Sequence, residues 1–131
     1  MKKLILFLAI AATTISCTAP ESDTKQENLI TEQTVTGIWL LQSRTLNEVP
    51  QKITFTETFI LTEDNRVRYF TDNGYNSNEG TWTLTNNQLE MKMDHTYPKR
   101  TIITNVLSTT NHVMKWERPY TGGTVIETYT K

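Results

Sequence analysis

The most regular feature of this chain is an alternation of apolar and polar residues, which recurs in short runs after residue 36. Apolar side chains at every second position, such as Trp82 and Leu84, are typical of strands with one buried face. No run after residue 36 repeats its apolar residues at the spacing of a helix. The alternation predicts strands at 37–44, 52–62, 66–72, 80–85, 88–94, 100–107, 112–118 and 124–130.

Short polar connections join these runs. Asn65 in the 63–65 loop and the pair Asn86-Asn87 suit hairpin turns, because asparagine tolerates a positive φ. A meander of this kind can close on itself and so remove its exposed edges. The predicted fold is all-β, a small antiparallel up-and-down barrel of about eight strands. A barrel of that size is either filled by its own side chains or holds one small ligand.

The start of the chain has a different pattern. Lys2 and Lys3 precede nine consecutive apolar residues, 4–12, and small polar residues follow. A positive start, a short apolar core and a small residue before a cut describe a secretory signal peptide. The apolar run is shorter than the roughly 20 residues of a membrane-spanning helix. We therefore expect residues 1–16 to be removed from the mature protein.

The only cysteine, Cys17, follows this run directly. Ile15, Ser16 and Cys17 resemble the lipobox of bacterial lipoproteins, although Thr14 stands where a leucine is usual. The resemblance implies that Cys17 becomes the first mature residue and carries diacylglycerol and an amide-linked acyl chain such as palmitate. Several acyl chains are enough for stable membrane anchoring. Thr18, rather than aspartate, follows the cysteine, which by resemblance favours the outer membrane of the cell envelope.

Composition divides the rest of the chain in two. Residues 17–35 are mostly polar and predict a lipid anchor followed by a disordered tether, although Leu29-Ile30 could dock on the domain or begin a helical turn. Residues 36–131 form the predicted barrel domain. Without Lys2 and Lys3 the mature chain has 11 basic and 14 acidic residues, a net charge of about −3. With no cluster of Lys or Arg to hold phosphates, nucleic acid is not an expected partner.

Two local motifs resemble a known family. Gly37-Ile38-Trp39 is similar to the G-x-W motif that opens lipocalins, and the hairpin at 80–91 resembles the "GTW…L" hairpin of small lipocalin-like lipoproteins. The resemblance covers residues 36–131 and implies an eight-stranded barrel with a possible hydrophobic ligand site. It also implies that Trp39 packs at the closed end of the barrel. The domain is shorter than a full lipocalin, and no C-terminal helix follows the last strand.

The alternation also indicates which residues could line a ligand site. Glu57 lies between Phe55 and Phe59 in an apolar row, where an inward carboxylate is costly unless it is paired or protonated. It could orient the polar head of a ligand, act as a proton donor, turn outward at a bulge, or pair with an arginine in the lumen. Aromatic and methionine side chains suit adaptable apolar pockets, although they could simply fill the barrel. The candidate lining residues are Phe55, Glu57, Phe59, Tyr69, Trp82, Met91, Met93 and Trp116.

Catalytic and metal chemistry have little support in the sequence. The histidines, His95 and His112, lack the spacing of a metal site, and no spacing indicates a nucleophile with its base. We therefore expect no enzyme activity, no metal and no cofactor. The leading hypothesis is a lipid-anchored envelope lipoprotein whose lipocalin-like domain binds a small apolar or amphipathic ligand. The alternative is a protein-interaction module with a filled barrel, such as an envelope accessory factor or a hydrolase inhibitor.

Overall fold

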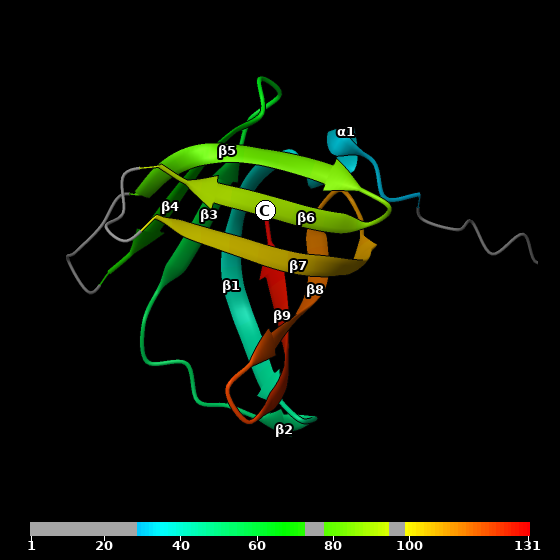
Figure 1. Ribbon diagram of the computed structural model, residues 1–131. Coiled ribbons are helices and arrows are strands. Elements are labelled where there is room, and N and C mark those ends of the chain that lie inside the picture. The colour runs from blue at the N-terminus through cyan, green and yellow to red at the C-terminus, as the bar shows by residue number, and fades with distance from the viewer. Residues whose placement is uncertain (1–28, 73–77, 95–98) are drawn as a thin grey trace, which may run out of the picture.

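The protein is a closed antiparallel β-barrel with one short helix (Figure 1). The computed structural model describes residues 29–72, 78–94 and 99–131. Helix α1 spans Glu32–Val35. The strands are β1 (Gly37–Leu46), β2 (Val49–Pro50), β3 (Glu57–Leu61), β4 (Arg66–Thr71), β5 (Asn78–Thr85), β6 (Gln88–Met93), β7 (Arg100–Thr109), β8 (Val113–Tyr120) and β9 (Gly123–Thr130).

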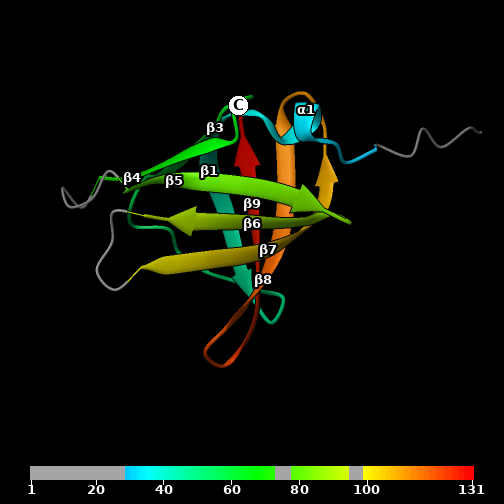
Figure 2. The ribbon, with the colours of Figure 1, turned by 45° about the horizontal axis from the view of Figure 1, so that its top comes forward.

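Pairing between the first and last long strands closes the barrel. Each long strand pairs with the next in the chain, and β1 also pairs with β9 from Leu40↔Thr130 to Leu46↔Val125. Strand β2 only extends the end of β1, so eight strands form the wall. Figure 2 shows β5, β6 and β7 crossing in front of β1, β8 and β9. The predicted all-β, eight-stranded barrel is confirmed.

The second predicted strand is wrong at its start. The alternation predicted strand from residue 52 to 62, but β3 begins at Glu57. Strand β1 pairs with β3 only from Gly37 to Leu40, and its later residues pair with β9 and β2 instead. Residues 51–56 therefore have no continuous partner strand, although Ile53 and Phe55 still pack against the core. Alternation alone could not show where the pairing partner changes.

Positive-φ residues make the tight turns. Asn86 and Asn87 have φ of 49° and 64°, and Asn65 has φ of 60°, so both predicted asparagine turns are confirmed. A third turn, at Asn47 (φ 48°) and Glu48 (φ 67°), connects β1 to β2 and was not predicted. The side chain of Asn47 joins it to the β8–β9 turn, donating to the carbonyl of Gly122 and accepting from the Thr124 amide.

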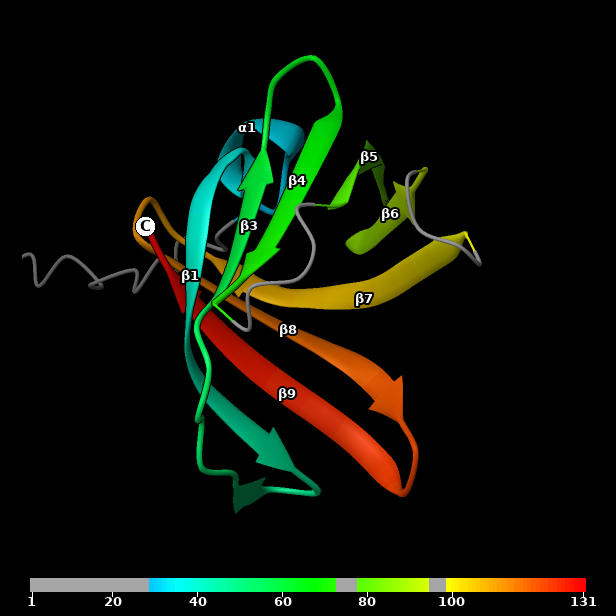
Figure 3. The same ribbon diagram turned by 90° about the vertical axis from the view of Figure 1, so that its left-hand side faces the viewer.

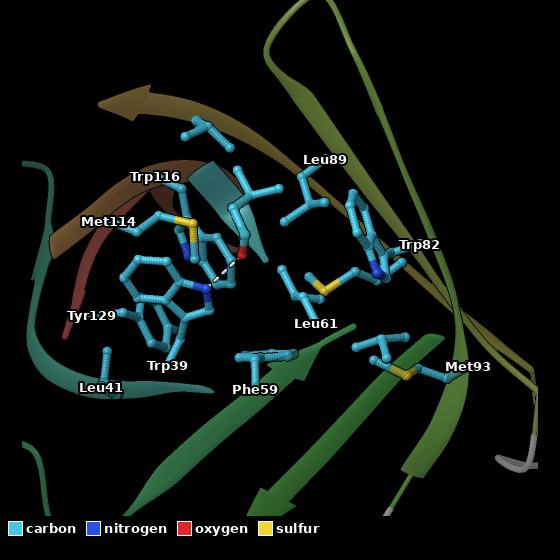
Figure 4. Close-up of a cluster of buried hydrophobic side chains, with 14 residues drawn as sticks. Trp39, Leu41, Phe59, Leu61, Trp82, Leu89, Met93, Met114, Trp116 and Tyr129 are labelled. Atoms are coloured by element: carbon cyan, nitrogen blue, oxygen red, sulfur yellow. Dashed lines mark hydrogen bonds between the residues drawn. The ribbon is translucent and has the colours of Figure 1, made fainter. Parts of the chain in front are cut away.

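The core lies inside the barrel and is mainly aromatic and aliphatic (Figure 4). Trp39, Trp82 and Trp116 are all at most 1% exposed, and Phe59, Trp116 and Tyr129 make ring contacts. The indole of Trp39 donates to the carbonyl of Val35 at 2.6 Å, the dashed line in Figure 4. Trp39 thus ties the start of β1 to α1, and it packs where the family resemblance placed it.

Helix α1 covers one end of the barrel, the end at the top of Figure 1. Thr31 and Thr34 form a reciprocal capping box, and Val35 is fully buried in the core. The packed domain therefore begins before residue 36, inside the segment predicted as tether. We call the end that α1 covers the closed end. The opposite end, at β2 and the β8–β9 turn, is the open end. Because the described core draws only on residues 30–129, a fragment of residues 29–131 contains all of it.

Several sequence predictions fall outside the described residues. They are the signal peptide 1–16, the lipidation site Cys17, the tether as far as residue 28, and His95. Within the part of the chain that is described, no helix has the length and apolar character needed to cross a bilayer.

Candidate functional site

A network of charged side chains lies inside the barrel toward the open end. Glu127 on β9 is 1% exposed and Glu57 on β3 is 6% exposed. Two arginines, Arg44 on β1 and Arg118 on β8, bring their guanidinium groups to these carboxylates. Burying four charges is costly unless each is paired, so the pairing geometry decides whether the network is tolerated.

A β-bulge turns Arg44 into the barrel. Trp39 and Leu41 point inward, so strict alternation would point Arg44 outward. The register shifts between Leu41 and Ser43, where β1 gains one residue relative to β9. Arg44 consequently lies directly opposite Glu127 across the two strands.

Glu127 holds both arginines. Arg118 donates from Nε and Nη2 to the two carboxylate oxygens, each at 3.0 Å, in a bidentate fork. Arg44 donates from Nε to Oε1 at 2.6 Å, and its Nη2 also contacts this oxygen. The indole of Trp116 donates to Oε2 at 2.8 Å. Every polar atom of this buried carboxylate is therefore satisfied.

Glu57 is held mainly by tyrosine hydroxyls. Tyr129 donates to Oε1 at 2.5 Å and Tyr69 donates to Oε2 at 3.0 Å. Nη2 of Arg44 lies 3.6 Å from Oε2. Of the alternatives that the sequence left open for Glu57, the structure shows an inward carboxylate paired with a lumen arginine.

The pKa values of the network reflect these contacts. Burial raises the pKa of a carboxyl group, but the hydrogen bonds and charge of Arg118, helped by Trp116 and Arg44, hold the pKa of Glu127 below its usual value. Burial lowers the pKa of Arg118, but Glu127 outweighs it and raises this pKa. Burial and the charges of Glu127 and Glu57 raise the pKa of Tyr129. Glu127 and Arg118 are thus charged at neutral pH, and Tyr129 is neutral.

Two cavities lie on either side of Arg118. The inner one measures about 20 Å³ and is lined by Glu57, Phe59, Tyr69 and Trp116 among others. That is room for about one water molecule. The outer one, which we call the open-end pocket, measures about 200 Å³ and is lined by Arg44, Leu46, Gln51, Lys52, Ile53, Arg118, Tyr120 and Val125. The space available to an organic ligand is therefore at the open end.

A larger hollow of about 330 Å³ lies on the outside of β3, β4 and β5. Three of its four charged side chains are already engaged, since Arg68 pairs with Glu79 at 3.0 Å and Asp64 accepts from the hydroxyl of Thr62; the fourth is Arg66. That hydroxyl is also the main reason that the pKa of Asp64 is lowered. Polar groups that satisfy one another on an exposed face offer little to a ligand, so this hollow is the weaker candidate.

The candidate lining residues are spread over three environments. Glu57, Phe59, Tyr69 and Trp116 surround the inner cavity. Trp82, Met91 and Met93 are fully buried core residues and line none of the three cavities described. The ring of Phe55 is half-buried, with the guanidinium of Arg44 5.2 Å from its centroid. Whether any of these side chains contacts a ligand remains a prediction.

The sequence analysis missed Arg44, Arg118 and Glu127. Glu127 lies between Val125 and Tyr129 just as Glu57 lies between apolar neighbours, and Arg118 continues the inward row of Met114 and Trp116. Glu127 and Arg118 could therefore have been predicted from the alternation. No local signal marks Arg44, because its orientation depends on the bulge.

No cluster of three or more potential metal ligands occurs among residues 29–72, 78–94 and 99–131. His112, the histidine within that part of the chain, is exposed at the β7–β8 turn.

Comparison with models of protein families gives a match to a known domain. Residues 35–116 match the family model described as a lipocalin-like domain. This match covers more than half of the chain. The matched segment includes α1's Val35, Trp39 and six complete long strands. No curated protein gives a significant match.

Proposed function

Because the chain belongs to the lipocalin-like domain family, we propose that it is a lipid-anchored envelope lipoprotein that binds a small apolar or amphipathic ligand. The observation that carries the binding proposal is the open-end pocket, which joins apolar side chains to pre-positioned polar groups. Such a combination is typical of small-molecule sites. The expectation that the protein is not an enzyme remains part of this proposal.

The filled lumen limits where a ligand can bind. Ligand cavities for drug-sized molecules usually measure about 300–1,000 Å³. The inner cavity is far smaller, at about 20 Å³, whereas the open-end pocket approaches the lower limit. We therefore place the ligand at the end of the barrel rather than along its axis.

Lipid anchoring is supported by the position of Cys17 after a short apolar run. A Cys17→Ala variant tests it in the producing cell. We expect the unchanged protein to incorporate labelled palmitate and to fractionate with the outer membrane, and the variant to incorporate none. Thr18→Ala, next to the acceptor, is the matched control and should be labelled normally. Labelling of the Cys17→Ala variant would contradict the assignment.

Ligand binding is tested by native mass spectrometry of protein extracted gently from its own cell. We expect a reproducible added mass that is lost on denaturation and is smaller than a phospholipid, because the pocket is small. A bare chain that also fails to bind any small organic compound at millimolar concentration would contradict the binding proposal.

The alternative of a protein-interaction module has its own support. The lumen is filled, and three exposed apolar side chains form a row on the outer face. Val113 and Leu40 both pair with Thr130, while Leu40 and Phe70 both pair with Thr58, so the row crosses five strands. A single Leu40→Arg substitution in this row should release a protein partner without affecting the open-end pocket.

A further inference from the structure

The lining of the open-end pocket has a marked charge bias. Arg44, Lys52 and Arg118 supply three cationic groups, and no carboxylate is among its lining residues. The nearest carboxylates, Glu57 and Glu127, lie behind the arginines on the side of the inner cavity. A ligand entering from the open end therefore meets positive groups first.

The two arginines are held in place before any ligand arrives. Their side chains are 19% and 18% exposed, and both are held by hydrogen bonds to Glu127. The ring of Phe55 supports Arg44 from one side. A rigid guanidinium loses little conformational entropy when it binds an anion, so pre-positioning favours affinity.

Each arginine retains hydrogen-bonding capacity. A guanidinium carries five N–H donors, and Glu127 and Glu57 engage only those on Nε and Nη2. Within the described part of the chain, Nη1 of Arg44 and of Arg118 is bonded to neither carboxylate. Because both side chains line the open-end pocket, we expect these donors to serve a ligand there.

The rest of the lining is apolar, and the pocket is short. Leu46, Ile53 and Val125 give an aliphatic surface beside the cationic groups. Arg118 lines both this pocket and the inner cavity, and the inner cavity, at about 20 Å³, is too small to take an acyl chain. Figure 3 shows β2, the end of β1 and the β8–β9 turn at the lower end of the barrel.

From this arrangement we propose that the open-end pocket binds a small monocarboxylate, held by Arg44, Arg118 and Lys52. Its short apolar body lies on the aliphatic surface beside them. The proposal rests on the proposed ligand-binding function and adds the charge and size of the ligand. A planar carboxylate matches the guanidinium fork, and a single negative charge suits a network in which the two arginines already share the charge of Glu127.

The test compares three eight-carbon probes that differ in their head group: octanoate, 1-octanol and octylamine. Each is titrated into ¹⁵N-labelled residues 29–131, and the Nε–H signals of Arg44 and Arg118 and the amides of 51–53 are followed by NMR. We expect octanoate to shift these signals. The neutral and cationic probes should bind at least about tenfold more weakly, the loss expected for one charge-assisted contact.

A matched pair of variants locates the effect. Lys52→Glu reverses an exposed charge in the pocket and leaves the buried network intact. Lys115→Glu makes the same charge change at an exposed position of β8 outside the pocket. We expect Lys52→Glu to weaken octanoate binding about fivefold and Lys115→Glu to leave it unchanged. Added salt should reduce the difference.

The outcomes separate this inference from the proposed function. Equal binding of the three probes at the pocket would overturn the monocarboxylate assignment while preserving a ligand-binding site. Tighter binding of inorganic phosphate than of octanoate at the same arginine signals would also overturn it. Failure of every probe at millimolar concentration would overturn the monocarboxylate assignment, and together with a bare chain in native mass spectrometry it would overturn both proposals.

Discussion

The two ends of this barrel use the same strand alternation for opposite chemistry. At the closed end, inward positions hold Trp39, Leu61, Leu89 and Met114, and α1 covers them (Figure 4). Toward the open end, inward positions of β1, β3, β8 and β9 hold Arg44, Glu57, Arg118 and Glu127. The first set stabilises the fold by excluding water. The second set places charge in the interior, where it needs partners to be tolerated.

This difference supports the ligand site proposed at the open end. Replacing a buried ion-pair network by well-packed apolar residues is often neutral or stabilising, so such a network is weak evidence for stability. The closed end shows that apolar side chains can fill this barrel. The charged network at the open end is therefore better explained by the pocket it lines, and its energetics should differ from those of the closed end.

The largest expected effect is at the closed end. Trp39→Ala removes a fully buried indole together with its hydrogen bond to α1, and should cost about 3–5 kcal/mol of unfolding free energy. Urea unfolding of residues 29–131 measures the loss. Ile38→Ala changes the neighbouring outward residue, which is 60% exposed, and should cost under about 0.5 kcal/mol. If Trp39→Ala and Ile38→Ala lowered the unfolding free energy by similar amounts, the description of Trp39 as a buried core residue at the closed end would be contradicted.

Glu127→Gln breaks the network at the open end. At neutral pH it leaves two buried arginines without their carboxylate, so we expect a loss of about 3 kcal/mol. The folded-state pKa of Glu127 lies below the usual 4.5, so its stabilisation is complete above 4.5 and is lost as the pH falls through that lower value. The unfolding free energies of Glu127→Gln and of the unchanged protein, measured in urea, should therefore converge in acid.

The control for this substitution is Glu63→Gln, at an exposed turn. It should have little effect at neutral pH. A stability difference between Glu127→Gln and the unchanged protein that stays constant from neutral pH into acid would contradict the ionised, arginine-bound state of Glu127.

The hydroxyls that hold Glu57 should have smaller, graded effects. Tyr129→Phe removes a buried donor to the carboxylate and should cost about 2 kcal/mol. Tyr69→Phe removes the other donor at a half-buried position and should cost about 1 kcal/mol. Thermal and urea unfolding of the two variants give the ranking. A larger loss for Tyr69→Phe would contradict the description of Tyr129 as the more deeply buried donor to Glu57.

The smallest expected effect is that of Thr104→Val, which should be neutral or stabilising, unlike the substitutions above. Thr104 is buried opposite Leu89, and its hydroxyl makes no hydrogen bond within the described residues. Thr104→Val should therefore leave the unfolding free energy unchanged or raise it by up to about 1 kcal/mol. Thr101→Val, at an exposed position of the same strand, is the control. A clear destabilisation by Thr104→Val would show that the hydroxyl has a partner.

Much of the fold could be predicted, because each strand's alternation and each asparagine turn are local properties. The turns at Asn65 and Asn86-Asn87 and most strand bounds follow from neighbouring residues alone. The candidate site was only partly predictable. Glu57 stood out as a carboxylate in an apolar row, but its partners come from strands far away in the chain, and no sequence spacing records which strands meet.

Local pattern is enough to specify a meander of half-buried strands, because side chains in a strand alternate between its faces whatever the strand pairs with. The candidate site depends instead on how distant strands pair. Closure of β1 against β9 sets the register, the bulge between Leu41 and Ser43 reverses the face of Arg44, and that reversal brings Arg44 to Glu127. One inserted residue exchanges the two faces of a strand, so the side chains at the open end depend on long-range pairing rather than on local pattern.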